Sequence, residues 1–212
     1  MPPKKRQSAG SAPRRTPPDV VGLRIVGGRF RGRKLLYSGD FRTRPMKDRL
    51  REAVFNLVGP AVVGKHAVDL FGGTGALGLE ALSRGAARAT FIEQHHPTAD
   101  LIGRNAAELG VADCCTIVPG NVFLWFRRRP DLGPAPWLVF CSPPYDFYVE
   151  RSEEMLTLLG GLLEAAPPES IFVVEADERF DFGLLPMPEQ WDVRPYPPAV
   201  VGIYRGAGCQ PA

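Results

Sequence analysis

The sequence lacks the features that would place the chain in a membrane, outside the cell or around a structural metal. It has no run of 18 or more apolar residues and no apolar segment behind the charges near its N-terminus, so neither a transmembrane helix nor a secretory signal is predicted. The four cysteines show no C-x-x-C spacing, and the three histidines are not grouped with them. We therefore expect a cytoplasmic protein with reduced thiols, no metal and no membrane partner.

Acidic residues are scarce in the first quarter of the chain. Residues 1–18 contain five basic and no acidic side chains, and residues 24–51 contain ten basic side chains against Asp40 and Asp48. Residues 52–212 reverse the balance, with 11 basic and 20 acidic side chains. This asymmetry predicts that one side of the molecule attracts a polyanion, nucleic acid being the leading candidate. A solvated charged surface is the alternative interpretation.

Glycines alternate with arginines in the basic region between Gly27 and Lys34. Glycine lets a backbone approach phosphates closely, and the arginine fork matches phosphate oxygens. Strands at 24–26 and 34–37 would make a basic β-hairpin around this turn, and apolar residues at helical spacing predict a helix over 46–58. The candidate nucleic-acid-binding residues are Arg29, Arg31, Arg33, Lys34, Arg44 and Arg49.

From His66 onward, predicted strands and helices alternate, which is typical of an α/β sandwich with a mostly parallel sheet. The strands are expected at 66–71, 88–93, 115–118, 136–141 and 170–175, and the helices at 75–85, 97–109, 121–127 and 151–164. Two further strands, at 190–194 and 200–205, would form a hairpin at the sheet edge. The chain is thus expected to divide into a disordered basic tail (1–18), a basic hairpin-and-helix extension (19–60), one catalytic domain (61–206) and a short tail (207–212).

A glycine-rich loop follows the first of the alternating strands. Gly73, Gly75 and Gly78 satisfy the pattern G-x-G-x-x-G, which brings a ligand to a helix N-terminus, although glycines can also serve only a tight turn. Asp69, beside the glycines, suits a cationic ligand such as S-adenosylmethionine better than a pyrophosphate.

Two polar side chains follow the next two strands. Glu93 can accept both ribose hydroxyls, in NAD as well as in S-adenosylmethionine. Asn121 is placed to meet an adenine, or to cap the following helix. The candidate cofactor-binding residues are Asp69, Phe71, Gly72, Gly73, Thr74, Gly75, Glu93 and Asn121.

Ser142-Pro143-Pro144-Tyr145 follows the apolar run 137–141. Two prolines remove two N–H donors and fix φ, so the chain leaves its strand in a rigid form whose carbonyls can accept hydrogen bonds from a ligand. A polar side chain before the prolines and an aromatic ring after them predict a pocket for a planar amine. A simple loop connector is the alternative.

These motifs together resemble the class I S-adenosylmethionine-dependent methyltransferases that modify exocyclic amino groups. Over about 23–205 the chain is similar, more closely, to the bacterial 16S ribosomal RNA (guanine(966)-N(2))-methyltransferase family. The segments that carry this resemblance are 24–28, 31–35, 44–45, 48–52, 55–56 and 75–86. The resemblance implies a Rossmann-like sandwich with a mostly parallel seven-stranded sheet, S-adenosylmethionine as cofactor, and methylation of a guanine N2 in the 16S rRNA of small-subunit particles. We also expect a monomer.

The resemblance further implies that Asp69, Gly73, Gly75, Glu93 and Asn121 hold the cofactor and that residues 142–145 hold the base. The Ser142 hydroxyl and the Pro143 carbonyl would accept the amine protons, while Tyr145 stacks on a flipped base. The family usually has Asp where this chain has Ser142, and a neutral hydroxyl is a weaker acceptor than a carboxylate, so slower catalysis is expected. The family also tends to have Thr where this chain has Met46.

Other functions stay open from the sequence. The same cofactor could serve methylation of adenine or cytosine in DNA, or of a protein glutamine. A nicotinamide-dependent oxidoreductase could use the glycine loop, but no obvious His or Tyr-x-x-x-Lys proton donor accompanies it. A non-catalytic rRNA-binding relative is conceivable because of Ser142.

Overall fold

The computed structural model of the chain describes residues 22–37, 39 and 45–209. Two subjects of the predictions, Arg44 and the tail 1–18, lie outside the described residues. The helices are α1 (Asp48–Val58), α2 (Ala76–Ser83), α3 (His96–Glu108), α4 (Val122–Arg127), α5 (Phe147–Glu150) and α6 (Ser152–Ala165). The strands are β1 (His66–Asp69), β2 (Arg88–Glu93), β3 (Cys115–Pro119), β4 (Trp137–Cys141), β5 (Ile171–Asp177), β6 (Trp191–Tyr196) and β7 (Ala199–Arg205).

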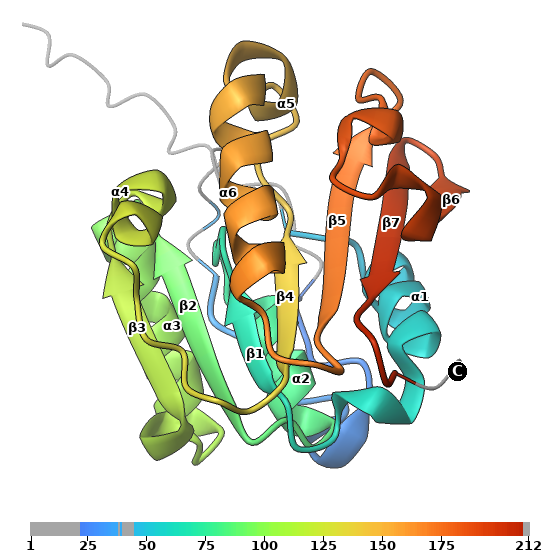
Figure 1. Ribbon diagram of the computed structural model, residues 1–212. Helices are drawn as coiled ribbons and strands as arrows, with labels where there is room; N and C mark the ends of the chain where they lie inside the picture. The colour runs from blue at the N-terminus through green and yellow to red at the C-terminus, as the bar shows by residue number, and fades with distance from the viewer. Residues whose placement is uncertain (1–21, 38, 40–44, 210–212) are drawn as a thin grey trace, which may run out of the picture.

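The strands form a seven-stranded sheet in the order β3-β2-β1-β4-β5-β7-β6. β1 to β5 run parallel, and β7 lies antiparallel to both β5 and β6 (Figure 1). The predicted α/β architecture, including the C-terminal hairpin at the edge, is therefore confirmed. Because the chain crosses from β3 over to β4 on the other side of β1, the C-terminal ends of β1 and β4 flank the crevice where open α/β sheets bind ligands.

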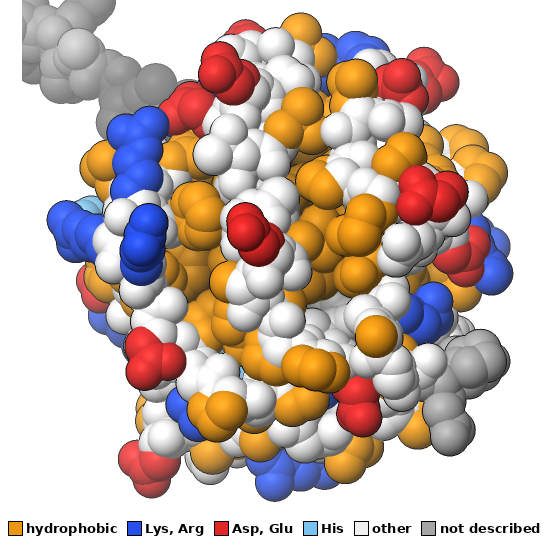
Figure 2. Space-filling view, viewed as in Figure 1, with side chains coloured by type: hydrophobic (Ala, Val, Ile, Leu, Met, Phe, Trp, Pro, Cys, Tyr) orange, Lys and Arg blue, Asp and Glu red, His pale blue; other side chains and the backbone are white. Residues whose placement is uncertain are grey.

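Alternating side chains of the strands feed two hydrophobic clusters, one on each face of the sheet. One face packs Ala67, Phe91 and Phe140 against α1, α2 and α3. The other packs Val68 and Val139 against α4 and α6, which lie in front of the sheet in Figure 1. Over this front face, hydrophobic side chains gather near the centre and most Lys and Arg side chains lie toward its edge (Figure 2).

The prediction of a two-stranded hairpin at 24–26 and 34–37 is wrong in detail. The two segments meet in a single bridge between Arg24 and Lys34, and a 3-10 turn, η1 (Gly28–Phe30), lies between them. The ladder ends at the turn because the Arg33 N–H donates to the Phe30 carbonyl instead of to Ile25. The Ile25 carbonyl accepts from Gly32 instead. The N–H groups of Val26 and Leu36 point away from the paired segment, and helix side chains accept them. Glu80 accepts the Val26 N–H at 2.8 Å, and Asn105 accepts the Leu36 N–H at 2.7 Å.

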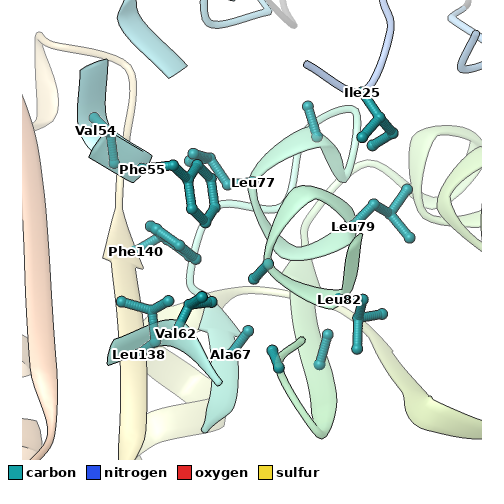
Figure 3. Close-up of a cluster of buried hydrophobic side chains, with 14 of the residues drawn as sticks. Ile25, Val54, Phe55, Val62, Ala67, Leu77, Leu79, Leu82, Leu138 and Phe140 are labelled. Carbon is teal, nitrogen blue, oxygen red and sulfur yellow. The ribbon is translucent and has the colours of Figure 1, made fainter. Parts of the chain in front are cut away.

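α1 completes the rear layer of the sheet rather than standing apart from it. Phe55 lies against Phe140, with ring centroids 5.6 Å apart, and Val54 and Leu77 lie beside this pair (Figure 3). Burial of such apolar side chains stabilises a fold by roughly 1.5–3 kcal/mol each. Of the helices that the described residues form, none has the length and apolar character needed to span a bilayer.

Buried charges fasten the same region. Arg51 is fully buried, and its guanidinium donates to the Met46 and Arg24 carbonyls and to Asp48. Its Nε lies 3.7 Å from the equally buried Glu80, which also accepts from Arg84 at 2.8 Å. This network joins the N-terminal segment, α1 and α2.

Candidate active site

A cavity of about 1020 Å³ opens at the C-terminal ends of the parallel strands. Its wall includes most of the polar side chains that follow β1, β2, β3 and β4, together with part of α1 and the turn between β6 and β7. The predicted site residues in this wall are Phe71, Gly73, Glu93, Asn121, Ser142, Pro143, Pro144, Tyr145 and Arg49. A volume of this size holds a ligand the size of a nucleoside cofactor with room beside it.

The glycine loop is shaped by Glu93. One carboxylate oxygen of Glu93 accepts the Gly73 N–H and the other accepts the His95 N–H, each at 2.7 Å. Gly75 has φ 77°, a left-handed conformation that favours glycine, and it immediately precedes α2. A Cβ at Gly78 would come within 2.3 Å of the Phe91 ring, so the third glycine of the pattern serves close packing of α2 on β2.

Asp69 lies behind the glycine loop rather than in the cavity wall. Its carboxyl group is 1% exposed and accepts the Gly78 N–H at 3.3 Å, while Oδ1 has no hydrogen-bond partner among the described residues. Burial raises the pKa of Asp69 to about 8, with the Gly78 bond opposing and Glu93 adding to the shift. A cation reaching this carboxyl would find an acceptor whose second oxygen is still available.

Asn121 caps α4, because its side-chain oxygen accepts the Phe123 and Leu124 N–H groups. Its amide nitrogen is not used by this cap. Beside it, Phe71, Phe123 and Phe147 form an aromatic floor with ring centroids 5.9 to 6.4 Å apart. The Arg151 guanidinium lies 4.1 Å from the Phe123 ring centroid and holds this cluster from outside.

The Ser-Pro-Pro-Tyr segment carries a partner that the sequence did not reveal. Glu175, on β5, accepts hydrogen bonds from the Ser142 hydroxyl and, at 2.7 Å, from the Tyr145 hydroxyl. Glu175 is 6% exposed and lines the cavity. Among the described residues no backbone N–H donates to the Pro143 carbonyl, whereas the Pro144 carbonyl accepts from Phe147.

The opposite wall comes from two segments that are distant in the sequence. Met46, just before α1, and Arg49, in its first turn, line one part of this wall. Tyr196 at the end of β6 and the turn residues Pro197 and Pro198 line the other part. The wall around Ser142 therefore includes a second tyrosine next to a second proline pair.

The structure does not bring all the predicted residues together. Arg29, Arg31, Arg33 and Lys34 are exposed and do not line the cavity. Their segment bonds to the last turns of α2 and α3: Phe30 N–H to Ser83, and Arg33 to the Glu108 carbonyl. α2 and α3 begin near the cavity, and the segment contacts their last turns. It therefore lies at the opposite ends of the parallel strands from the cavity, where Figure 1 shows it in blue. Gly72, Thr74 and Gly75 form the loop backbone without lining the cavity.

Sequence reasoning missed Glu175, Tyr196 and two of the three rings of the aromatic floor, Phe123 and Phe147. Glu175 has a signal in retrospect, since it is the acid in the otherwise apolar run 171–176 of a central strand. A charged residue in such a run is rarely fully buried without a partner. The turn at 196–198 carries no comparable signal, because only the sheet order brings it to the cavity.

A family model described as conserved hypothetical protein 95 matches residues 23–194. The chain is 36% identical over 174 residues to ribosomal RNA small subunit methyltransferase D of Escherichia coli (strain K12), an alignment that spans 81% of this chain and 82% of that protein. It is 32% identical over 175 residues to the protein of the same name from Haemophilus influenzae, spanning 82% and 88%.

Solved structures give the same picture. The Escherichia coli protein yhhF, described as a candidate methyltransferase, matches with a TM-score of 0.71 and 32% identity, covering 89% of this chain and 99% of that chain. An RNA methyltransferase from Salinibacter ruber, solved with S-adenosyl-L-homocysteine, has a TM-score of 0.58 and 21% identity and covers 79% and 97%. At that identity it is evidence for a Rossmann-like methyltransferase fold.

Proposed function

The chain belongs to the family described as conserved hypothetical protein 95, and from this we propose that it methylates the exocyclic N2 amine of a guanine in small-subunit ribosomal RNA. Two relatives named ribosomal RNA small subunit methyltransferase D support the coarser statement, S-adenosylmethionine-dependent methylation of rRNA. The guanine, its N2 position and the residue roles are our proposal. The domain limits at 18, 60 and 206 and the monomeric state stay predictions.

One observation carries the proposal. A single cavity joins the glycine loop and Glu93 on one side to Ser142 and Tyr145 on the other. A methyl donor bound at the first side and a planar amine bound at the second would face each other inside the same cavity, without bulk solvent between them. Such alignment can lower a barrier by about 7–11 kcal/mol and needs no metal ion.

The residues present fit S-adenosylmethionine. Each Glu93 oxygen accepts one backbone N–H and retains a lone pair for a ribose hydroxyl. The Asn121 amide nitrogen can donate to an adenine ring nitrogen while its oxygen caps α4. A cationic end of the ligand brought next to Asp69 would favour the ionised form of this buried carboxyl group. When bound, the cofactor supplies a methyl group activated by its sulfonium.

The base side of the cavity fits an exocyclic amine. The lone pair of such an amine is delocalised into the ring, and acceptors on both N–H bonds favour the pyramidal nitrogen that attacks a methyl group. The Pro143 carbonyl and the Ser142 hydroxyl oxygen provide these two acceptors, and the Tyr145 ring provides a stacking surface for a base turned out of its helix.

RNA would contact a larger surface than the cavity. The exposed Arg49 at the cavity wall would meet phosphates next to the modified base. The basic segment at the other edge of the sheet would meet a more distant part of the same RNA, so the footprint extends along one side of the molecule. A substrate with tertiary structure, such as an assembling ribosomal particle, suits this separation better than a short strand.

Methyl transfer to unmodified small-subunit particles tests the proposal. The protein is incubated with methyl-labelled S-adenosylmethionine and particles that lack the modification, and the labelled nucleoside is identified. Primer extension then locates the modified position. We expect label in N2-methylguanine.

The competing functions give different results in the same assay. Label in adenine or cytosine of duplex DNA, or in a glutamine of a release factor, would move the activity to another amine. No label with tight binding to rRNA would leave a non-catalytic binding protein. Calorimetry that detects NADH but no S-adenosylhomocysteine would support an oxidoreductase instead.

A further inference from the structure

We propose that Glu175 is a positioning residue that makes the Ser142 hydroxyl an effective proton acceptor for the substrate amine. This inference rests on the proposed function. In relatives with Asp before the proline pair, the negative charge would lie directly at the amine. In this chain the inference assigns that charge to Glu175 on the neighbouring strand.

Strand register places the two side chains together. β4 and β5 pair in parallel with Cys141 opposite Val174, so the next residues along the two strands, Ser142 and Glu175, emerge side by side at the C-terminal edge. Glu175 Oε2 accepts the Ser142 hydroxyl proton, and Oε1 accepts that of Tyr145. Both hydroxyl groups are thereby oriented, and the Ser142 oxygen keeps a lone pair for another donor.

Glu175 is held in an unusual way for a buried carboxylate. It forms no ion pair within 4 Å with any described Lys, Arg or His, and the nearby Arg179 instead pairs with Asp146 and Asp177. A buried charge with only neutral hydroxyl partners stabilises a fold less than an apolar side chain of similar size. Stability therefore gives no reason for Glu175, whereas a charge acting on the cavity does.

The chemical step balances with the groups present. As the bond between N2 and the methyl carbon forms, the bond between that carbon and sulfur breaks and its electron pair stays on sulfur. N2 then gives up one proton to Ser142 Oγ, and Ser142 passes its own hydroxyl proton to Glu175. The products are N2-methylguanine, S-adenosylhomocysteine and a protonated Glu175, which returns its proton to solvent before the next turnover.

The test is a set of single and double variants assayed for kcat and KM on small-subunit particles. E175Q keeps the shape and an acceptor for the Ser142 hydroxyl but removes the charge. We expect it to lower kcat roughly 100-fold, the lower end of the contribution of proton-transfer catalysis, with an unchanged KM for RNA and unchanged affinity for S-adenosylhomocysteine. E164Q, at the exposed end of α6, is the matched control and should retain the wild-type kcat.

Double variants separate this role from a structural one. In the S142A background E175Q should cause no further loss, and in the S142D background, where a carboxylate faces the amine directly, it should change kcat less than about threefold. If E175Q retains the wild-type kcat, or lowers it equally in all three backgrounds, the inference is overturned and the proposed function stands. If the wild-type chain labels no guanine, the proposed function fails and the inference fails with it.

Discussion

Around α1, buried polar side chains bond to backbone groups and to one another, whereas at the C-terminal edge of the sheet they line an open cavity. Arg51 and Glu80 each have several protein partners and no exposure. Ser142, Glu93 and Asn121 make one or two hydrogen bonds within the protein and also line the cavity. Each retains a lone pair or an amide hydrogen for a ligand. Buried polar side chains around α1 thus stabilise the fold, whereas those at the carboxyl ends of the strands are available for ligand binding.

The clearest case is a pair of arginines two positions apart on α1. Arg49 is exposed and lines the cavity, while Arg51 is fully buried and bonds to the Arg24 carbonyl. Sequence alone treats them alike, since both belong to one basic run. The predictions below test whether the division between the two regions holds.

The largest effect is expected from R51M. Removal of the guanidinium leaves the Arg24 and Met46 carbonyls and Asp48 without their donor, and breaking such a buried pair costs about 3–5 kcal/mol. Urea unfolding measures the free energy. R49M on the same helix should change stability by less than about 0.5 kcal/mol; equal losses in the two variants would erase the comparison.

Y145A should affect the substrate and spare the fold. Loss of one base-stacking ring is worth about 1–3 kcal/mol, so KM for the RNA should rise by roughly 10- to 100-fold. Calorimetry should find the affinity for S-adenosylhomocysteine unchanged. Y145F retains the ring and should bind RNA nearly as well as the wild type; a loss as large as that of Y145A would show that the hydroxyl, rather than stacking, is responsible.

Asp69 is buried like the polar residues around α1, but it lies behind the glycine loop next to the cavity. The pH dependence of stability reports on its ionisation. Its pKa is raised to about 8 in the folded chain from 3.8, so its contribution to stability is fully present below 3.8 and is lost as pH rises to about 8. The free energy of unfolding of the wild type should therefore fall across that window. D69N has no such titration, so its stability relative to wild type should improve steadily between pH 5 and pH 8. Parallel stability curves for the two proteins would contradict the shifted pKa.

The smallest effect is expected from the basic segment. Replacing Arg29, Arg31 and Arg33 with glutamine should reduce the slope of log affinity against log salt by roughly 0.7–0.9 for each phosphate that is no longer neutralised. Filter binding at several salt concentrations measures the slope. The matched control replaces three exposed arginines at the end of α4, Arg127, Arg128 and Arg129, and should leave the slope nearly unchanged. Equal slopes for the two triple variants would argue against a specific role for the segment.

The sheet can be predicted because each central strand is a short apolar run that ends in a turn signal. The pattern predicts β2 at 88–93, where it lies, and it also predicts the edge hairpin of β6 and β7. The predicted hairpin at 24–37 is reduced to one bridge, and other N–H groups of its segment donate to Glu80, Ser83 and Asn105, side chains about 53 to 69 positions away. Local pattern cannot reveal such partners.

The candidate site is predictable where each residue sits at the end of its own strand, as Glu93 and Ser142 do. Glu175 cannot be paired with Ser142 without knowing that β4 and β5 are neighbours in register. Tyr196 requires one more step, because β7 must insert between β5 and β6 before the turn at 196–198 reaches the cavity.

The hydrogen bonds between the N-terminal segment and Glu80, Ser83 and Asn105 have a consequence for protein engineering. The segment cannot be exchanged between methyltransferases as a cassette, because a donor version would arrive without the helix residues that satisfy its backbone. Transplanting it requires α2 and the end of α3 as well. The segment and these helices therefore depend on one another structurally.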